Sequence, residues 1–355
     1  MNPYIYLRVL RHADHTVFCV QDGQKSYYDP TFGRRMAYSS GQQVKRSVLE
    51  ALTDALDAPM APITFNYEIN KAGKMTNKEP WSPCDPHYVD QLIGGWMRAA
   101  SENYTVKRRS PLSISAMRPL HPLLGGMEME TENLTFDRSD RPENHPVIVR
   151  MEGQKEPMTE EQIDEWLKGN CRTLPRRHWI PDNRRASGLF VFDVAIDLRR
   201  LFCVSTNPHE PELTPEMIET LKNEGWIESE NRFGHCLVLP KEKREEVIPA
   251  LAHALLNWRI TSNQARTFSL METLAVAISD NANTLAGAIR TKLIDDGGDR
   301  PKAKPVVDGS AGADVFVTLP AAGYFATSIE SADALAAAER DLTERMLAFD
   351  YEHQK

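Results

Sequence analysis

Four cationic side chains gather around a pair of serines near the start of the chain, and their types and spacing suit the binding of an anion. The stretch is TFGRRMAYSSGQQVKRSVLEAL (31–52), in which Arg34 and Arg35 precede the serines and Lys45 and Arg46 follow them. The start of a helix presents free N–H groups that attract phosphate, and nearby cations add to that attraction. We therefore predict that these four residues bind phosphate groups.

Serine and glutamine side chains mark the start of the helix itself. Ser39 and Ser40 both suit the N-cap position, and each is followed three residues later by a glutamine, Gln42 or Gln43. This spacing is that of two overlapping capping boxes. Gly41 has no side chain that would cover the first turn, so we expect the N–H groups of that turn to be open to a ligand.

Cations in the second turn of this helix need an explanation. The apolar residues from Val44 to Leu56 recur on one helical face, and Lys45 and Arg46 fall beside that face. The helix dipole makes this end positive, so cations here lower stability unless an anion is bound. A solvated basic face is the alternative. The sequence has no GxxxxGK[ST] loop and no GxGxxG motif after a strand, which disfavours a nucleotide, and a polyanion such as a nucleic-acid backbone fits better.

Other basic and polar residues extend this predicted surface. One basic cluster leads into an alternating strand, five arginines occur within residues 172–186, and a polar turn precedes a later strand. From these groups the further candidates are Lys107, Arg108, Arg109, Arg176, Arg177, Gln264 and Arg266. An ordinary polar turn is the alternative for the last two. Trp179, beside the arginines, either stacks on a base or packs under the surrounding segment.

Composition excludes some classes of protein. The 355 residues carry a net charge of -8, with 41% hydrophobic and 26% charged residues, as in ordinary soluble proteins. A negative total does not exclude a nucleic-acid partner, because a polyanion responds to the local field of a groove. No apolar run approaches the ~18 residues of a membrane span, and the start lacks a secretory signal, so we expect a cytoplasmic protein without a membrane partner. The five dispersed cysteines form no CxxC motif, so we expect reduced thiols and no metal site.

These residues must be positioned by strands and helices that interleave as in an α+β fold of the ferredoxin type. The predicted strands cover residues 4–10, 16–20, 107–117, 188–205 and 266–279. The predicted helices cover residues 41–57, 88–97, 158–170, 213–227, 240–258 and 331–353. We expect loops at 58–90 and 295–314, and an insertion between two core strands at 118–186.

Three segments resemble a known family in the same order along the chain. FGRRMAYSSGQQVKRSVLEAL is similar to the FGG-R-R-ISSQ-KR segment of the backbone subunit of type I CRISPR surveillance complexes (Cascade), a member of the RAMP superfamily. GLFVFDVAIDLRRL (188–201) resembles the strand that follows the thumb insertion of that family. LAHALLNWRITSNQARTFSLMETLAVAIS (251–279) resembles its late helix, polar loop and strand.

The resemblance implies a fold and a division of the chain. The family fold is a modified RNA-recognition-motif palm with a protruding thumb and helical fingers. On this reading residues 1–117 are the first part of the palm, with finger elements at about 58–106. Residues 118–186 are the thumb, and residues 187–355 complete the palm with a C-terminal helix.

The resemblance also implies a function. Copies of the family's subunit line up along one CRISPR RNA, hold its backbone and leave bases exposed for pairing with target DNA. The expected partners are therefore CRISPR RNA, target DNA, further copies of the chain and other Cascade subunits. Ser39, Ser40, Gln42 and Gln43 would hold RNA phosphates together with the cations. No catalytic residue, cofactor or metal is expected.

Two alternatives stay open. Related type III backbone subunits cleave target RNA with a thumb aspartate and a divalent metal, and Asp137 and Asp140 lie in the corresponding insertion here. The second alternative is an α+β enzyme that holds a small phosphorylated substrate at the Ser–Gly helix start. It predicts a compact monomer or dimer that retains no RNA.

Overall fold

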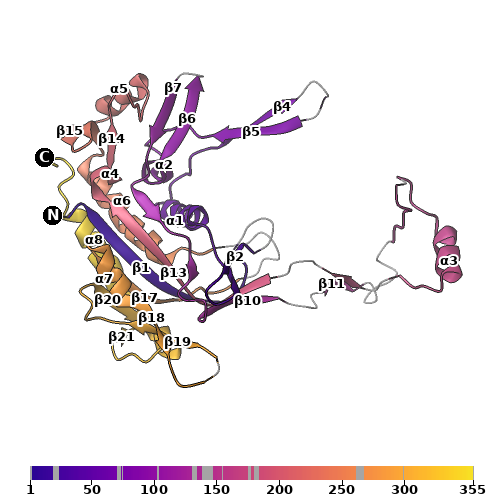
Figure 1. The fold of residues 1–355 in the computed structure, drawn as a ribbon. Coiled ribbons are helices and arrows are strands. Elements are labelled where there is room, and N and C mark those ends of the chain that lie inside the picture. The colour runs from indigo at the N-terminus through magenta and orange to yellow at the C-terminus, as the bar shows by residue number, and fades with distance from the viewer. Residues whose placement is uncertain are drawn as a thin grey trace. The chain divides into compact units, whose positions relative to one another are not determined.

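The chain is described from a computed structural model, shown as a ribbon in Figure 1. The residues described are 2–18, 24–69, 73, 75–101, 104–129, 134–137, 147–153, 155–174, 177–179, 184–260, 268–298 and 300–354. The chain divides into two compact units, the larger formed by Met1–Met127 with Ala186–Lys355 and the smaller by Glu128–Arg185.

The larger unit is built on a mainly antiparallel sheet with the strand order β10-β13-β1-β17-β20-β21. Two short strands, β8 and β9, also pair with β13. The strands are β1 (Tyr4–Thr16), β8 (Leu112–Ile114), β9 (Arg118–Pro119), β10 (Gly125–Met129), β13 (Arg184–Asp197), β17 (Thr273–Ser279), β20 (Asp314–Thr318) and β21 (Glu330–Ser331). A mixed α+β fold with an antiparallel main sheet is therefore confirmed.

The first strand is longer than its apolar pattern predicted. The strand expected at 4–10 is confirmed as part of β1, which continues to Thr16. The separate strand expected at 16–20 is not found at Val17 and Phe18, and its last two residues lie outside the described residues. It is hydrogen-bonded on both sides, with Leu7 opposite Val194 of β13 and opposite Ile278 of β17. Pairing along both edges satisfies the main chain of the polar residues, so the strand does not depend on their side chains.

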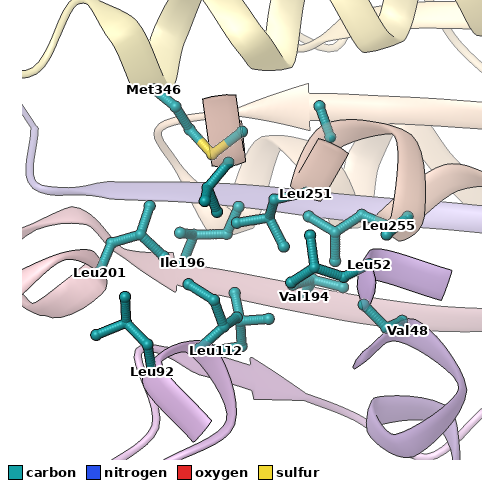
Figure 2. Close-up of a cluster of buried hydrophobic side chains, with 14 of the residues drawn as sticks. Val48, Leu52, Leu92, Leu112, Val194, Ile196, Leu201, Leu251, Leu255 and Met346 are labelled. Carbon is teal, nitrogen blue, oxygen red and sulfur yellow. The ribbon is translucent and has the colours of Figure 1, made fainter. Parts of the chain in front are cut away.

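One face of the sheet is covered by helices that bury the main apolar core. These are α1 (Gly41–Ala55), α2 (Val89–Gly94), α6 (Lys241–Asn257) and α8 (Ala334–Leu347). Figure 2 shows Val48 and Leu52 of α1 near Val194 of β13, with Leu251 and Leu255 of α6 close by. The apolar face predicted for α1 is therefore confirmed, since Val44, Val48 and Leu52 are buried in this core.

The opposite face of the sheet carries a second, smaller apolar cluster. Along β17, Val276 and Ile278 point into the main core, whereas Ala275 and Ala277 point into this second cluster. Its covering elements are α7 (Ala282–Ala288), β18 (Ile289–Ile294), β19 (Lys302–Val307) and the 3-10 helix η2 (Leu319–Gly323). The loop expected at 295–314 is therefore wrong in part, since β19 and the start of β20 lie within it.

Three hairpins and a small sheet complete the larger unit. The hairpins are β2 (Ser26–Asp29) with β3 (Arg34–Ala37), β4 (Thr64–Ile69) with β5 (Met75–Trp81), and β6 (Trp96–Ser101) with β7 (Tyr104–Arg108). The small sheet and its neighbours are α4 (Leu198–Leu201), β14 (Cys203–Ser205), α5 (Pro215–Asn223), β15 (Ile227–Asn231) and β16 (Gly234–Val238). The loop expected at 58–90 is wrong in part, because it contains β4, β5 and the start of α2, whereas residues 58–63 and 82–88 lie outside helices and strands.

The strand predicted at 188–205 is wrong in part, because β13 ends at Asp197 and α4 separates it from β14. The strand predicted at 266–279 begins only at Thr273 among the described residues.

Two further predicted elements differ from the structure for a local reason. The helix at 88–97 stops at Gly94, because Gly95 has a φ of 78° and the chain then enters β6. The strand at 107–117 is split around Pro111, which lacks an N–H group and separates β7 from β8.

The smaller unit contains one helix and one strand pair among its described residues. Helix α3 (Glu160–Gly169) is confirmed, with Thr159 as N-cap and a full capping box to Gln162. The strand pair is β11 (Leu134–Asp137) with β12 (Arg177–Trp179). The assignment of this region as a thumb, and of residues 58–106 as fingers, stays a prediction.

Candidate nucleic-acid interface

The start of α1 is capped by one serine of the pair and anchored by the other. The Ser40 hydroxyl accepts a hydrogen bond from the Gln43 N–H at 3.4 Å. Ser39 is buried, and its N–H and carbonyl each bond to the main chain of Met117 at 3.0 Å. Of the two N-caps that the sequence allows, the structure uses Ser40, while Ser39 fastens the incoming chain to the sheet.

Gly41 serves close packing instead of leaving the first turn open. A Cβ atom at this position would overlap the carbonyl oxygen of Ile114 and lie 3.1 Å from the carbonyl carbon of Ser115. The first turn of α1 therefore lies directly against the end of β8. Gln42, the next residue, is exposed, and Gln43 is half-buried.

The two arginines before the serines lie on the β2–β3 hairpin, and both are exposed. Arg34 is opposite Asp29, and its Nη1 donates to the carbonyl oxygen of Pro122 at 3.2 Å. Arg35 is opposite Tyr28, and its Nη1 lies 3.5 Å from the Ser26 hydroxyl. Both guanidinium groups thus keep donors available for an anion.

Tyr28 is a candidate that the sequence reasoning missed. Its side chain is 62% exposed and lies directly across the hairpin from Arg35. An exposed aromatic ring beside a guanidinium is a platform on which a nucleobase can stack. The signal was present in YYDPTFGRR, because an Asp-Pro…Gly turn between two tyrosines and two arginines predicts a hairpin that places them opposite each other.

Lys45 and Arg46 are adjacent in sequence but differ in their surroundings. Arg46 is 55% exposed and pairs with Glu50 at 2.7 Å, one turn along α1. The Lys45 ammonium instead donates to the carbonyl oxygens of Gly94 at 2.9 Å and Leu112 at 3.4 Å. Burial, with the charge of Arg108 adding to it, lowers the pKa of Lys45 to about 8. Arg46 faces solvent, whereas Lys45 ties α1 to α2 and β8.

The basic cluster on β7 divides in the same way. The Arg108 side chain is 1% exposed, and its guanidinium donates to the carbonyl oxygens of Leu92, Arg200 and Cys203. Burial lowers the pKa of Arg108 to about 10. Lys107 and Arg109, on either side of it, are exposed. Arg108 therefore has a packing role, and its neighbours are the cations that a ligand can reach.

Several candidates lie outside the described residues, namely Arg176, Gln264, Arg266 and Asp140. For Arg177, His178, Trp179 and Asp137 only the strand pairing of the main chain is described. From the sequence, His121 and His178 are also candidates for a catalytic or stacking role. The His121 ring packs edge-on against Phe32, with the ring centroids 4.8 Å apart, and burial lowers its pKa. The His121 side chain therefore packs against the turn between β2 and β3.

The described residues contain neither a cluster of metal ligands nor a membrane-spanning helix. No group of three or more His, Cys, Asp or Glu side chains in this part of the chain is arranged to hold a metal ion. Among the same residues, no helix has the length and apolar character needed to cross a bilayer. The four cysteines described, Cys84, Cys171, Cys203 and Cys236, are free thiols.

Comparison with known proteins gives weak likenesses. No family model and no curated protein matches the chain. One similar solved structure is titled "CRISPR RNA-guided surveillance complex, pre-nicking", with a TM-score of 0.45 and 10% identity, covering 97% of this chain and 88% of that chain. Another, titled "CRISPR RNA-guided surveillance complex", has a TM-score of 0.38 and 11% identity, covering 97% of this chain and 83% of that one. Both TM-scores are too low to establish a shared fold.

Proposed function

We propose that the chain binds CRISPR RNA through its sugar–phosphate backbone, as the backbone subunit of a type I, Cascade-like surveillance complex. The observation that carries this proposal is the exposed set of Tyr28, Arg34, Arg35 and Arg46 on one hairpin and the helix that follows it. The last three belong to the segment that resembles the Cascade backbone family. Phosphate contacts carry no sequence information, which suits a subunit that must hold any guide.

The proposal assigns a role to each part of the chain. The main sheet with its helices is the RRM-like palm, residues 58–106 are the fingers, and residues 118–186 are the thumb. Copies follow one another along the guide through an open, heterologous contact, and the bases left exposed pair with target DNA. Other Cascade subunits complete the particle. The chain itself has no catalytic step, so cleavage belongs to a partner.

The test begins with co-expression of the chain, its guide and its partner subunits. We expect a large particle by light scattering, with a high ratio of absorbance at 260 to 280 nm and one discrete small RNA. The triple variant R34Q/R35Q/R46Q removes three exposed cations. It should lower the slope of log affinity against log salt by about 2 at most, because each phosphate contact on a single strand contributes about 0.7.

A matched control is K241Q/K243Q, which removes two exposed lysines from the N-terminal end of α6. It should leave the slope of log RNA affinity against log salt unchanged. A protein that stays small and free of RNA in every preparation would contradict the proposal. If the triple variant keeps the wild-type salt slope, the β2–β3 hairpin and α1 are not part of the RNA site.

A further inference from the structure

The β18–β19 hairpin carries a row of cations on its outer face. The strands pair antiparallel, so Arg290 lies opposite Val306, Lys292 opposite Lys304, and Ile294 opposite Lys302. Successive rungs on one face are two residues apart, which is about 7 Å along a strand. Four cationic side chains therefore share one face over three neighbouring rungs.

The inner face of the same hairpin is fixed to the core. Ile289 is fully buried in the second apolar cluster, and Val307, opposite it, packs on that cluster. Pro305 on the next rung is also buried. Because side chains alternate between the two faces of a strand, this anchoring holds the cationic face toward solvent.

Two of the four cations are already neutralised, and two are not. Arg290 pairs with Asp308 at 3.0 Å, and Lys302 pairs with Asp296 at 2.6 Å. Lys292 and Lys304 are exposed, and neither has an ion pair or side-chain hydrogen bond within the described part of the chain. Like charges directly across a strand pair lower stability. The sequence thus places two uncompensated positive charges on facing positions of the hairpin, where a bound anion would relieve their repulsion.

We propose that this face binds the phosphodiester backbone of double-stranded DNA, at a site separate from the guide surface. Lysine is a point charge that suits phosphate oxygens, whereas recognition of carboxylates favours the planar fork of arginine. Lys292 and Lys304 face each other on one rung, where opposite Cβ atoms lie about 5 Å apart, so both ammonium groups can reach neighbouring phosphates of one DNA strand. The hairpin packs on one face of the main sheet and α1 packs on the other, so the proposed duplex site and the proposed guide site are separate surfaces. The inference rests on the proposed function only in taking this duplex to be the DNA that the guide pairs with.

The experiment measures binding of a short fluorescein-labelled DNA duplex of random sequence to the full chain, alone and with its guide. Anisotropy titrations at several salt concentrations compare the wild type with K292Q/K304Q and with the control K241Q/K243Q. We expect the hairpin variant to lower the slope of log affinity against log salt by about 1.8 at most, since each phosphate contact on duplex DNA contributes about 0.9. The control should keep the wild-type slope.

Two parallel readouts separate this site from the guide site and from a role in folding. Guide retention should be unchanged in K292Q/K304Q, and its melting temperature should be equal to or slightly above that of the wild type, because a repulsion has been removed. If the wild type retains no guide RNA but K292Q/K304Q still lowers the salt slope of duplex binding, the proposed function is wrong and the duplex site is supported.

The duplex site itself is overturned by any of three results. One is an unchanged salt slope in K292Q/K304Q, and another is an equal loss in the control variant. The third is binding of polyglutamate to this face when the DNA duplex does not bind there. That result would assign the face to an acidic protein instead.

Discussion

At the scale of the residue, the charge of Lys45 makes stability depend on pH. Its pKa falls from 10.5 to about 8, so between these values the unfolded chain binds more protons than the folded chain. Stability contributed by this group therefore rises with pH across that window and stays at its low level below it. We predict that the melting temperature of the wild type, minus that of Lys45→Met, increases from pH about 8 to about 10.5. Lys241→Met, which removes an exposed ammonium, is the control, and a constant difference for Lys45→Met would mean that the ammonium is solvated.

At the scale of the element, the docking of α1 depends on the missing side chain of Gly41. A methyl group there would meet the main chain at Ile114 and Ser115, which cannot move as a flexible side chain does. We predict that Gly41→Ala lowers the free energy of unfolding by roughly 1–3 kcal/mol, measured by urea denaturation. Gly169→Ala, at the end of α3 with open space around it, should be neutral or slightly stabilising. Equal stability of both variants would show that α1 does not pack closely on β8.

The elements that the sequence predicted are those whose signals are local. Helix α3 follows from Thr159 as its N-cap and from the acids of its first turn, and α1 follows from its caps and its single apolar face. The β18–β19 hairpin was missed because KAKPVV lacks a clean apolar alternation. The β4–β5 hairpin was missed although TFNYEI alternates polar and apolar residues, because the segment around it is rich in Pro, Lys and Asn and indicates a loop. Each strand of these hairpins is held by its partner strand, and β18–β19 also packs on a part of the core that is distant in sequence. A few consecutive residues cannot reveal either kind of contact.

The candidate site was predictable to the same extent. The hairpin turn and the arginine pair are encoded within a dozen residues, so their exposure agrees with the sequence reasoning. The burial of Lys45 and Arg108 was not predictable, because it depends on carbonyl oxygens supplied by Gly94, Leu112 and Arg200 from other elements. A basic cluster in a sequence does not reveal which of its members face inward.

At the scale of the whole molecule, the smaller unit is inserted at one place in the main sheet. The chain leaves that sheet on β10 and returns on β13, and these strands are hydrogen-bonded neighbours. The close approach of Gly188 to Gly125 and the bond from the Leu189 N–H to the Leu124 carbonyl (2.8 Å) fasten the point of exit. We predict that replacing residues 130–183 by a short Gly-Ser turn leaves the larger unit folded, with a cooperative melting transition and native far-UV circular dichroism. A variant that is unfolded would show that the larger unit depends on the insertion.

The two faces of the main sheet also have an electrical consequence. α1 and the β18–β19 hairpin cover opposite faces, so a sheet and its packing layers, each about 10 Å thick, lie between their charges. The Debye length at physiological ionic strength is about 8 Å. The core thus holds the two surfaces more than one Debye length apart, and salt in the surrounding solvent weakens the repulsion between polyanions bound on the two sides. If both proposed sites are occupied, this separation lets two polymers of like charge share one molecule at a small electrostatic cost.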